Sequence, residues 1–177
     1  MSFSTIKTAI RNTAPSKGLL ILTSTISLIA GITLSTHLSA ADAVMDKSKA
    51  EAIMHQRHEN FEDIGGSFKT IRDEFKAKTP DMAKIDSAAK TIAKLATELK
   101  TWFPEGTGPE TGIKTETKAE IWTDKAGFEE AADKFIAASK TFAGLTATGD
   151  AKQVMGGMRG LGGACKNCHD KYREEDD

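Results

Sequence analysis

The sequence is poor in the residues that interrupt helices or cross-link chains. Its 177 residues include four prolines and two cysteines, and no proline falls inside the long segments that follow residue 43. We find no nucleophile–base pair, no metal-binding helix motif and no phosphate-binding loop, so no class of enzyme is indicated. Neither sign of charge dominates, with 24 Lys+Arg against 25 Asp+Glu, which argues against nucleic acid as a partner.

Acidic residues are absent from the first 41 positions. Lys7, Arg11 and Lys17 precede an uncharged apolar run over 19–35, and small residues follow at 39–41. This order is typical of a secretory signal, so we expect a signal peptide over 1–41 and one domain over 42–177. Because the run is about as long as a marginal membrane span, an uncleaved anchor is the alternative. Removing the three basic residues leaves 21 bases against 25 acids, a net charge of −4, which suits the periplasm.

The remaining residues predict four helices and little else. The expected ranges are about 44–78, 80–101 and 124–146, with a fourth helix that begins at Gly149-Asp150. Apolar residues recur every three or four positions in each range, as in the helices of a bundle. Thr79 is the expected N-cap of the second helix, with Pro80 at its first position. Short first and third connections imply antiparallel neighbours, so the expected fold is an all-α antiparallel four-helix bundle.

The second connection, residues 102–123, is long and rich in Gly, Pro and Thr. Loops of this length inside a compact domain are usually functional or disordered. Trp102 and Trp122 lie at its two ends, and we expect them to pin it to the body of the domain. It is either a tethered crossover or a segment that also contacts a ligand.

The strongest functional signal is the string CKNCH at 165–169. Cys165 and Cys168 are three residues apart, so on a helix their thiols face the same side. They can form thioether links to the two vinyl groups of a haem, and His169 can then ligate the iron. The sequence therefore favours one covalently bound haem c.

Three other interpretations compete for this string. A disulfide between the two cysteines would be strained within one helical turn. A zinc site needs four ligands, and only His55 and His58 remain after residue 41 to complete one. A thioredoxin-like redox pair expects neighbouring strands, and none is apparent.

Five glycines, at 156, 157, 160, 162 and 163, precede the string. Each costs about 1 kcal/mol relative to alanine inside a helix, so their presence needs a reason. A flat macrocycle pressed against bare backbone would supply one. The alternative is that the fourth helix begins near Gly162 and the other glycines lie in a loop.

The apolar stripe of the first helix contains one arginine. Only eight residues follow His169, so a sixth iron ligand would have to come from an earlier helix, most simply the first. The stripe followed backward from Phe61 reaches Arg57 and then Met54. A guanidinium on an apolar stripe needs an anion, and a haem propionate is the expected one. The alternative is an arginine whose stem lies along the core edge and whose head is in water.

These features together resemble cytochrome c′, the class II c-type cytochromes. The resemblance rests on CKNCHDKYR at 165–173, AEIW at 119–122 and RHENF at 57–61, and it covers about 44–175. It implies that Cys165 and Cys168 carry the thioethers and that His169 is the proximal axial ligand.

The resemblance also implies roles for residues outside the string. Arg57 matches an arginine that meets a haem propionate, and His58 matches its neighbour at the haem edge. Arg173 matches the basic residue beside the proximal histidine, and Glu116 lies where the family often has a haem-edge acid. Phe61 matches the apolar residue over the open face of the iron. In low-spin members a methionine stands at that position and ligates the iron, so Phe61 predicts five-coordinate, high-spin iron.

Two functions follow for such a haem: electron transfer with redox partner proteins, and binding of small gases such as NO and CO. An apolar distal side offers no hydrogen bond to dioxygen, so NO is the preferred gas. The alternatives are a low-spin electron carrier ligated by Met54, without gas binding, or a non-haem helical metal-binding domain. Related proteins are often dimers through their first two helices, so a homodimer is an alternative to a monomer.

Overall fold

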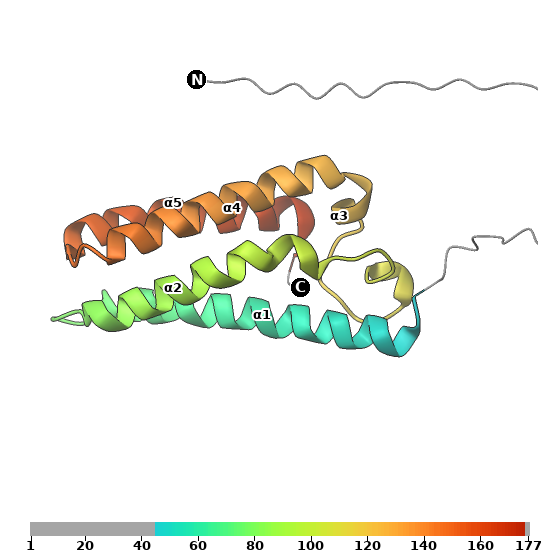
Figure 1. The fold of residues 1–177 in the computed structure, drawn as a ribbon, viewed down its shortest axis with the longest axis horizontal. Helices are drawn as coiled ribbons and strands as arrows, with labels where there is room; N and C mark the ends of the chain where they lie inside the picture. Colours follow the sequence, from blue (N-terminus) through green and yellow to red (C-terminus); the bar gives the residue numbers. More distant parts are fainter. Residues whose placement is uncertain (1–44, 176–177) are drawn as a thin grey trace, which may run out of the picture. The chain divides into compact units, whose positions relative to one another are not determined.

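The computed structural model describes residues 45–175. Its four long helices are α1 (Lys47–Glu74), α2 (Met82–Glu98), α4 (Lys125–Thr146) and α5 (Ala151–Tyr172) (Figure 1). Two 3₁₀ helices, η1 (Leu99–Trp102) and η2 (Pro109–Thr111), and the short α3 (Glu120–Thr123) lie between α2 and α4. The described residues contain no strand, only an isolated bridge between Thr117 and Arg173. The predicted four-helix fold is confirmed, whereas the predicted signal peptide and its boundary lie outside the described residues.

The start of α2 differs from the prediction. We expected Thr79 to cap a helix that begins at Pro80, but α2 begins at Met82 and its N-cap is Asp81. The Asp81 carboxylate accepts hydrogen bonds from the backbone N–H groups of Ala83 and Lys84, at 3.0 and 3.1 Å. A carboxylate also interacts favourably with the positive end of the helix dipole, which an uncharged threonine hydroxyl does not.

The turn between α4 and α5 follows the prediction. Gly149 adopts a φ of 72°, in the left-handed region that glycine tolerates. Asp150 then caps α5 by accepting hydrogen bonds from the N–H groups of Lys152 and Gln153. Because α5 is continuous from Ala151, the alternative that this helix begins only near Gly162 is wrong.

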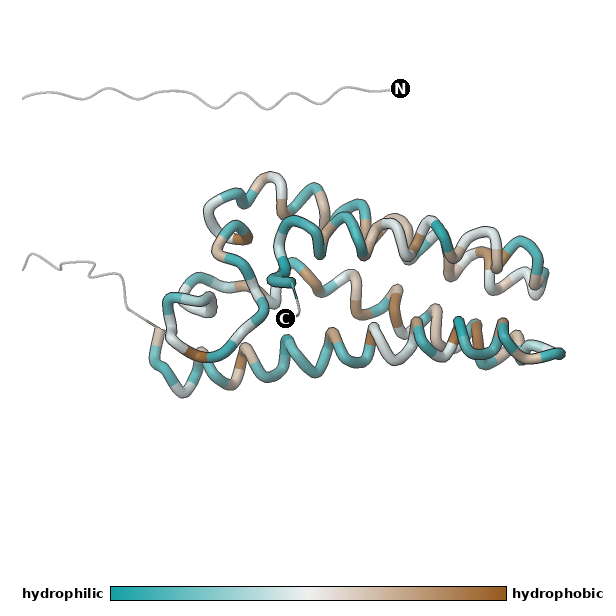
Figure 2. The backbone as a smooth tube through the Cα atoms, turned by 180° about the vertical axis from the view of Figure 1, so that it is seen from behind, coloured by the Kyte–Doolittle hydropathy of each residue, from teal (hydrophilic) through white to brown (hydrophobic). Residues whose placement is uncertain are grey.

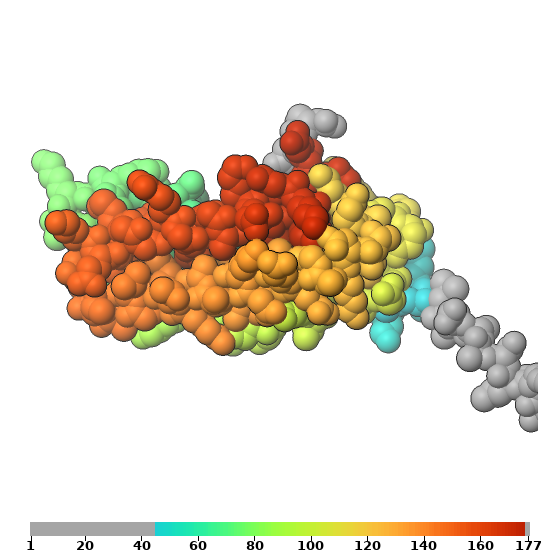
Figure 3. Space-filling view, turned by 90° about the horizontal axis from the view of Figure 1, so that it is seen from above, coloured from blue at the N-terminus to red at the C-terminus, as the bar shows by residue number. Residues whose placement is uncertain are grey.

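The helices pack in a definite order. α1 packs on α2, α2 on α4, and α4 on α5, while α1 and α5 have no comparable backbone contact. α4 and α5 lie side by side along one face (Figure 3), and apolar and polar residues alternate along each helix (Figure 2). Among the described residues no helix is long and apolar enough to span a membrane. The fully buried core is mainly aliphatic, with Ile71, Ile85, Ile92, Phe142, Val154 and Leu161.

Candidate functional site

The CxxC thiols lie in the last two turns of α5. Cys165 and Cys168 are half-buried against the apolar core, and both are free cysteines rather than a disulfide. His169 follows on an exposed part of the same turn. Burial raises the pKa of Cys165, and it raises the pKa of Cys168 to about 11. Both groups are therefore neutral thiols at pH 7, available on one side of one helix.

The glycines of α5 have different surroundings. A Cβ on Gly157 would stand 2.6 Å from Leu145 Cδ1 and 3.3 Å from the Phe142 ring, so close packing on α4 explains this glycine. A Cβ on Gly156, Gly160 or Gly163 would meet no protein atom within 4 Å. The expectation of a macrocycle against bare backbone therefore does not apply to Gly157.

Arg57 is buried in α1, with only 3% of its surface exposed. Its Nη1 donates to the Trp102 carbonyl (3.4 Å) and to Thr107 Oγ1 (3.3 Å), and its Nη2 donates to the Thr107 carbonyl (3.0 Å). Burial lowers the pKa of Arg57 to about 10, with Glu110 opposing the shift, so the group stays charged at neutral pH. The alternative of a guanidinium in open water is wrong, because this head lies under the crossover loop.

Phe61 belongs to a cluster of aromatic rings next to Arg57. Its ring meets Trp102 edge-on at 5.3 Å between centroids, and Phe103 at 6.2 Å. The Phe103 ring also lies 4.8 Å below the Arg57 guanidinium carbon, a cation–π contact. Phe61 therefore stands one turn after Arg57, between two rings of the connection that follows α2.

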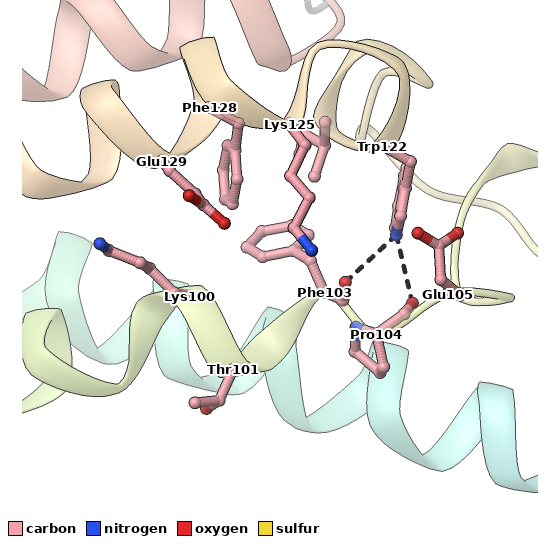
Figure 4. A pocket seen from close by; sticks show the side chains of 10 residues that line it. Lys100, Thr101, Phe103, Pro104, Glu105, Trp122, Lys125, Phe128 and Glu129 are labelled. Carbon is pink, nitrogen blue, oxygen red and sulfur yellow. Dashed lines mark hydrogen bonds between the residues drawn. The ribbon is translucent and has the colours of Figure 1, made fainter.

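The loop is pinned at both ends, as predicted. Trp102 is buried beside Phe61, and Trp122 Nε1 donates to the carbonyls of Phe103 (3.1 Å) and Pro104 (3.2 Å). Figure 4 shows these two bonds beside a pocket of about 380 Å³. The pocket is lined by Lys100, Thr101, Phe103, Pro104, Glu105, Ile121, Trp122, Lys125, Phe128 and Glu129.

Glu116 and Arg173 come together although 57 positions separate them. Arg173 Nε and Nη2 each lie 2.8 Å from Glu116 Oε2, an ion pair in which two donors share one carboxylate oxygen. The backbone adds a bond from Glu174 N–H to the Glu116 carbonyl (2.8 Å) and another from Lys118 N–H to the Tyr172 carbonyl (3.0 Å). The loop is therefore fixed to the turn that follows His169.

His58 is not brought to the other predicted site residues. It lies on the exposed side of α1, where its Nε2 is 3.4 Å from Glu62 Oε1. His55 makes a similar, longer contact with Glu59. Across residues 45–175 no group of three or more His, Cys, Asp or Glu side chains could hold a metal ion.

Sequence reasoning missed Asp124, which joins α4 to the end of α5. This carboxylate caps α4 through Gly127 N–H, and it accepts hydrogen bonds from Tyr172 Oη (3.0 Å) and Lys171 Nζ. These bonds, first that from Lys171, lower the pKa of Asp124. The prediction placed Asp124 as the first residue of the third helix, and an aspartate at that position was the available signal for the cap.

Sequence reasoning also missed Thr107 and Phe103. Thr107 is fully buried and donates from Oγ1 to the Pro104 carbonyl at 2.8 Å. Phe103 contacts Phe128 as well, and Phe128 contacts Tyr172, so one chain of rings runs from Phe61 to α5. No local pattern in a Thr-rich loop singles out either residue.

Comparison with known proteins agrees with this arrangement. The family model described as Cytochrome C′ matches residues 52–173. The cytochrome c′ of Rubrivivax gelatinosus is 39% identical over 122 residues, which cover 67% of this chain and 92% of that protein.

Solved structures give the same result. A cytochrome c′ described as having ligand-controlled dimer dissociation matches with a TM-score of 0.66 and 28% identity, over 71% of this chain and 97% of that one. A nitric oxide complex of a cytochrome c prime variant from Alcaligenes xylosoxidans matches in fold, with a TM-score of 0.64 and 23% identity, over 72% and 97%. The chain therefore belongs to the cytochrome c′ family, whose members are electron-carrying proteins with one covalently bound haem c.

Proposed function

We propose that this protein works in the periplasm as a cytochrome c′ whose haem iron keeps an open sixth position, which lets it bind nitric oxide as well as carry electrons. Cys165 and Cys168 would hold the haem through two thioethers, and His169 would be the one protein ligand of the iron. The bound haem supplies one-electron redox chemistry and an iron site for small gases.

The attachment proposal rests on the donor set of α5. Two uncharged thiols lie on one side of the helix, half-buried and not joined to each other, and an imidazole follows directly. The close helix packing of α1 on α2, α2 on α4 and α4 on α5 has no counterpart between α1 and α5, so the backbones are least tightly packed between the helix of the thiols and the helix of Phe61. These residues fit a c-type haem.

The attachment is tested by extraction with acidified acetone. Wild-type protein should keep its haem through denaturation, because a thioether does not break when the fold is lost. Replacing both Cys165 and Cys168 with Ala should release all of it, while each single variant should retain haem through the remaining thioether. Haem that extracts freely from the wild type would contradict thioether attachment at Cys165 and Cys168.

The open sixth position is supported by Phe61 and by Met54. Phenylalanine has no lone pair to offer the iron, and its ring is held among other rings. Met54 lies seven residues earlier, about 10 Å along the helix axis. Its sulfur is buried and accepts a hydrogen bond from Thr111 Oγ1 at 3.8 Å, under the loop. This position argues against Met54 as the sixth ligand.

An optical spectrum of the Phe61→Met variant tests the open position. A thioether there should convert a high-spin spectrum into a low-spin one and slow CO and NO binding by at least tenfold, about 1.4 kcal/mol in the barrier. Phe75→Met, half-buried beyond the far end of α1, is the matched control and should keep the wild-type spectrum. A wild type that is already low-spin, with a methionine-to-iron band, would leave electron transfer as its sole role.

Nitric oxide is the gas we favour. The rings of Phe61 and of Phe103 beside it offer bound dioxygen no hydrogen-bond donor. The nitric oxide complex reported for the Alcaligenes xylosoxidans variant adds support from a protein of the same fold. Redox partners and a homodimer stay predictions.

A further inference from the structure

Arg57 contacts both residues whose rings pack against Phe61. Arg57 Nη1 donates to the carbonyl of Trp102, and the guanidinium lies over the ring of Phe103. Both rings contact Phe61, at 5.3 and 6.2 Å between centroids. Arg57 therefore links the two residues that pack on the Phe61 ring.

The guanidinium is itself held from the loop side by Thr107. Thr107 accepts from Nη1 with Oγ1 and from Nη2 with its carbonyl, and its hydroxyl donates to the Pro104 carbonyl. The side chain is 0% exposed, so water cannot replace the hydroxyl if it is removed. Thr107 thus joins Arg57 of α1 to the Pro104 carbonyl of the loop by hydrogen bonds.

These bonds leave part of the guanidinium available. Arginine has five N–H donors, and three of them are used by Trp102 and Thr107. The loop bonds are therefore compatible with a propionate on the same side chain.

We propose that Thr107 is a positioning residue that, through Arg57, keeps Phe61 closed over the open iron position and so sets the rate at which a small gas reaches the iron. This inference rests on the proposed open sixth position. Without the Thr107 hydroxyl, one buried Nη1–H loses its acceptor and the loop opens more often. Phe61 then moves aside more often, and the gas enters faster.

The test compares two isosteric substitutions in the full haem-loaded protein. Thr107→Val removes the hydroxyl beside Arg57. Thr146→Val is the matched control. Thr146 is also buried, and the one proton of its hydroxyl is shared between Asp86 Oδ1 (2.8 Å) and the Ala143 carbonyl (2.9 Å), at the other end of the bundle. The measurements are the CO association rate of the ferrous protein, hydrogen exchange of the amides of 103–112, and the urea midpoint.

We expect Thr107→Val to raise the CO association rate about fivefold, the change in an equilibrium that one hydrogen bond makes. Exchange in 103–112 should rise with it. Both variants should lower the urea midpoint by similar amounts. Thr146→Val should leave the CO association rate and the exchange in 103–112 unchanged. A CO rate that stays at the wild-type value in Thr107→Val, or that rises equally in both variants, would overturn the inference.

The same experiment separates this inference from the proposed function. A low-spin wild-type spectrum would contradict the open iron position, and the gating role with it. Unchanged exchange in 103–112 in a high-spin Thr107→Val variant would contradict the role of Thr107 alone.

Discussion

The two ends of the bundle bury different kinds of side chain. At the end that holds the α1–α2 and α4–α5 turns, the buried side chains are mainly apolar and fully enclosed, with Ile71, Ile85, Phe142 and Val154 at 1% exposure or less. The other end carries the CxxC thiols, a buried arginine, a buried threonine and a chain of aromatic rings. We call these the aliphatic end and the site end.

Different interactions hold the buried side chains in place at the two ends. Apolar packing dominates at the aliphatic end, where the buried hydroxyl of Thr146 is satisfied locally by Asp86 and the Ala143 carbonyl. At the site end each buried polar group needs a partner, and no buried side-chain nitrogen or oxygen of residues 45–175 lacks one. Such a network fixes the positions of rings and backbone more narrowly than apolar contact does. The site end is thus specified by bonds between distant segments.

The largest expected effect belongs to the aliphatic end. Phe142→Ala should lower the free energy of unfolding by about 3–5 kcal/mol, because it empties a fully buried ring site. The haem spectrum and CO binding should not change while the variant is folded. Urea unfolding followed by circular dichroism, with spectra at zero urea, checks both. A shifted spectrum in the folded variant would mean that the two ends are not independent.

An intermediate effect separates two neighbouring glycines of α5. Gly157→Ala should cost about 1–3 kcal/mol, because its Cβ would overlap Leu145 and approach Phe142. Gly156→Ala is the matched control and should stabilise by about 0.5–1 kcal/mol, because its Cβ meets no protein atom and alanine favours the helix. Urea midpoints of both variants give the measurement. If both substitutions changed the free energy of unfolding in the same direction, the close packing of Gly157 on α4 would be contradicted.

The smallest effect is electrostatic and lies at the site end. Hydrogen bonds, the largest from Lys171, lower the pKa of Asp124 in the folded state. The ionised carboxylate therefore stabilises the fold fully above the unfolded aspartate pKa of about 3.9. This stabilisation is lost as the pH falls through the lower pKa of the folded state. Asp124→Asn should therefore be slightly less stable than wild type at pH 7, and the difference should vanish in acid. The effect is small because the carboxylate is partly exposed. A difference that is constant from pH 7 to pH 3 would refute it.

The sequence predicts the helices because their pattern is local. The apolar stripe of α1 is buried or half-buried from Met54 to Phe75, and the cap at Asp150 is a local signal as well. Thr79 failed as a cap because Asp81 competes for the same role two residues later. In both cases the information lies within a few residues of the feature.

The partners of Arg57 could not be predicted in the same way. They are two carbonyls and a hydroxyl that lie 45 and 50 positions away. Every residue has a carbonyl, so nothing in the sequence marks these. The pairing of Glu116 with Arg173 is equally distant, and only the resemblance placed both near one site. The roles of Cys165, Cys168 and His169 toward the haem stay predictions.

The aromatic residues also determine what optical methods can report about this molecule. Both tryptophans and the single tyrosine of the chain belong to the site end, where Trp102 meets Phe61, Trp122 meets Phe103 and Tyr172 meets Phe128. Intrinsic fluorescence and near-ultraviolet dichroism therefore sense this end, whereas far-ultraviolet dichroism sums all four helices. Unfolding curves from the two kinds of signal coincide only if both ends melt together, so their separation measures the cooperativity between the ends directly.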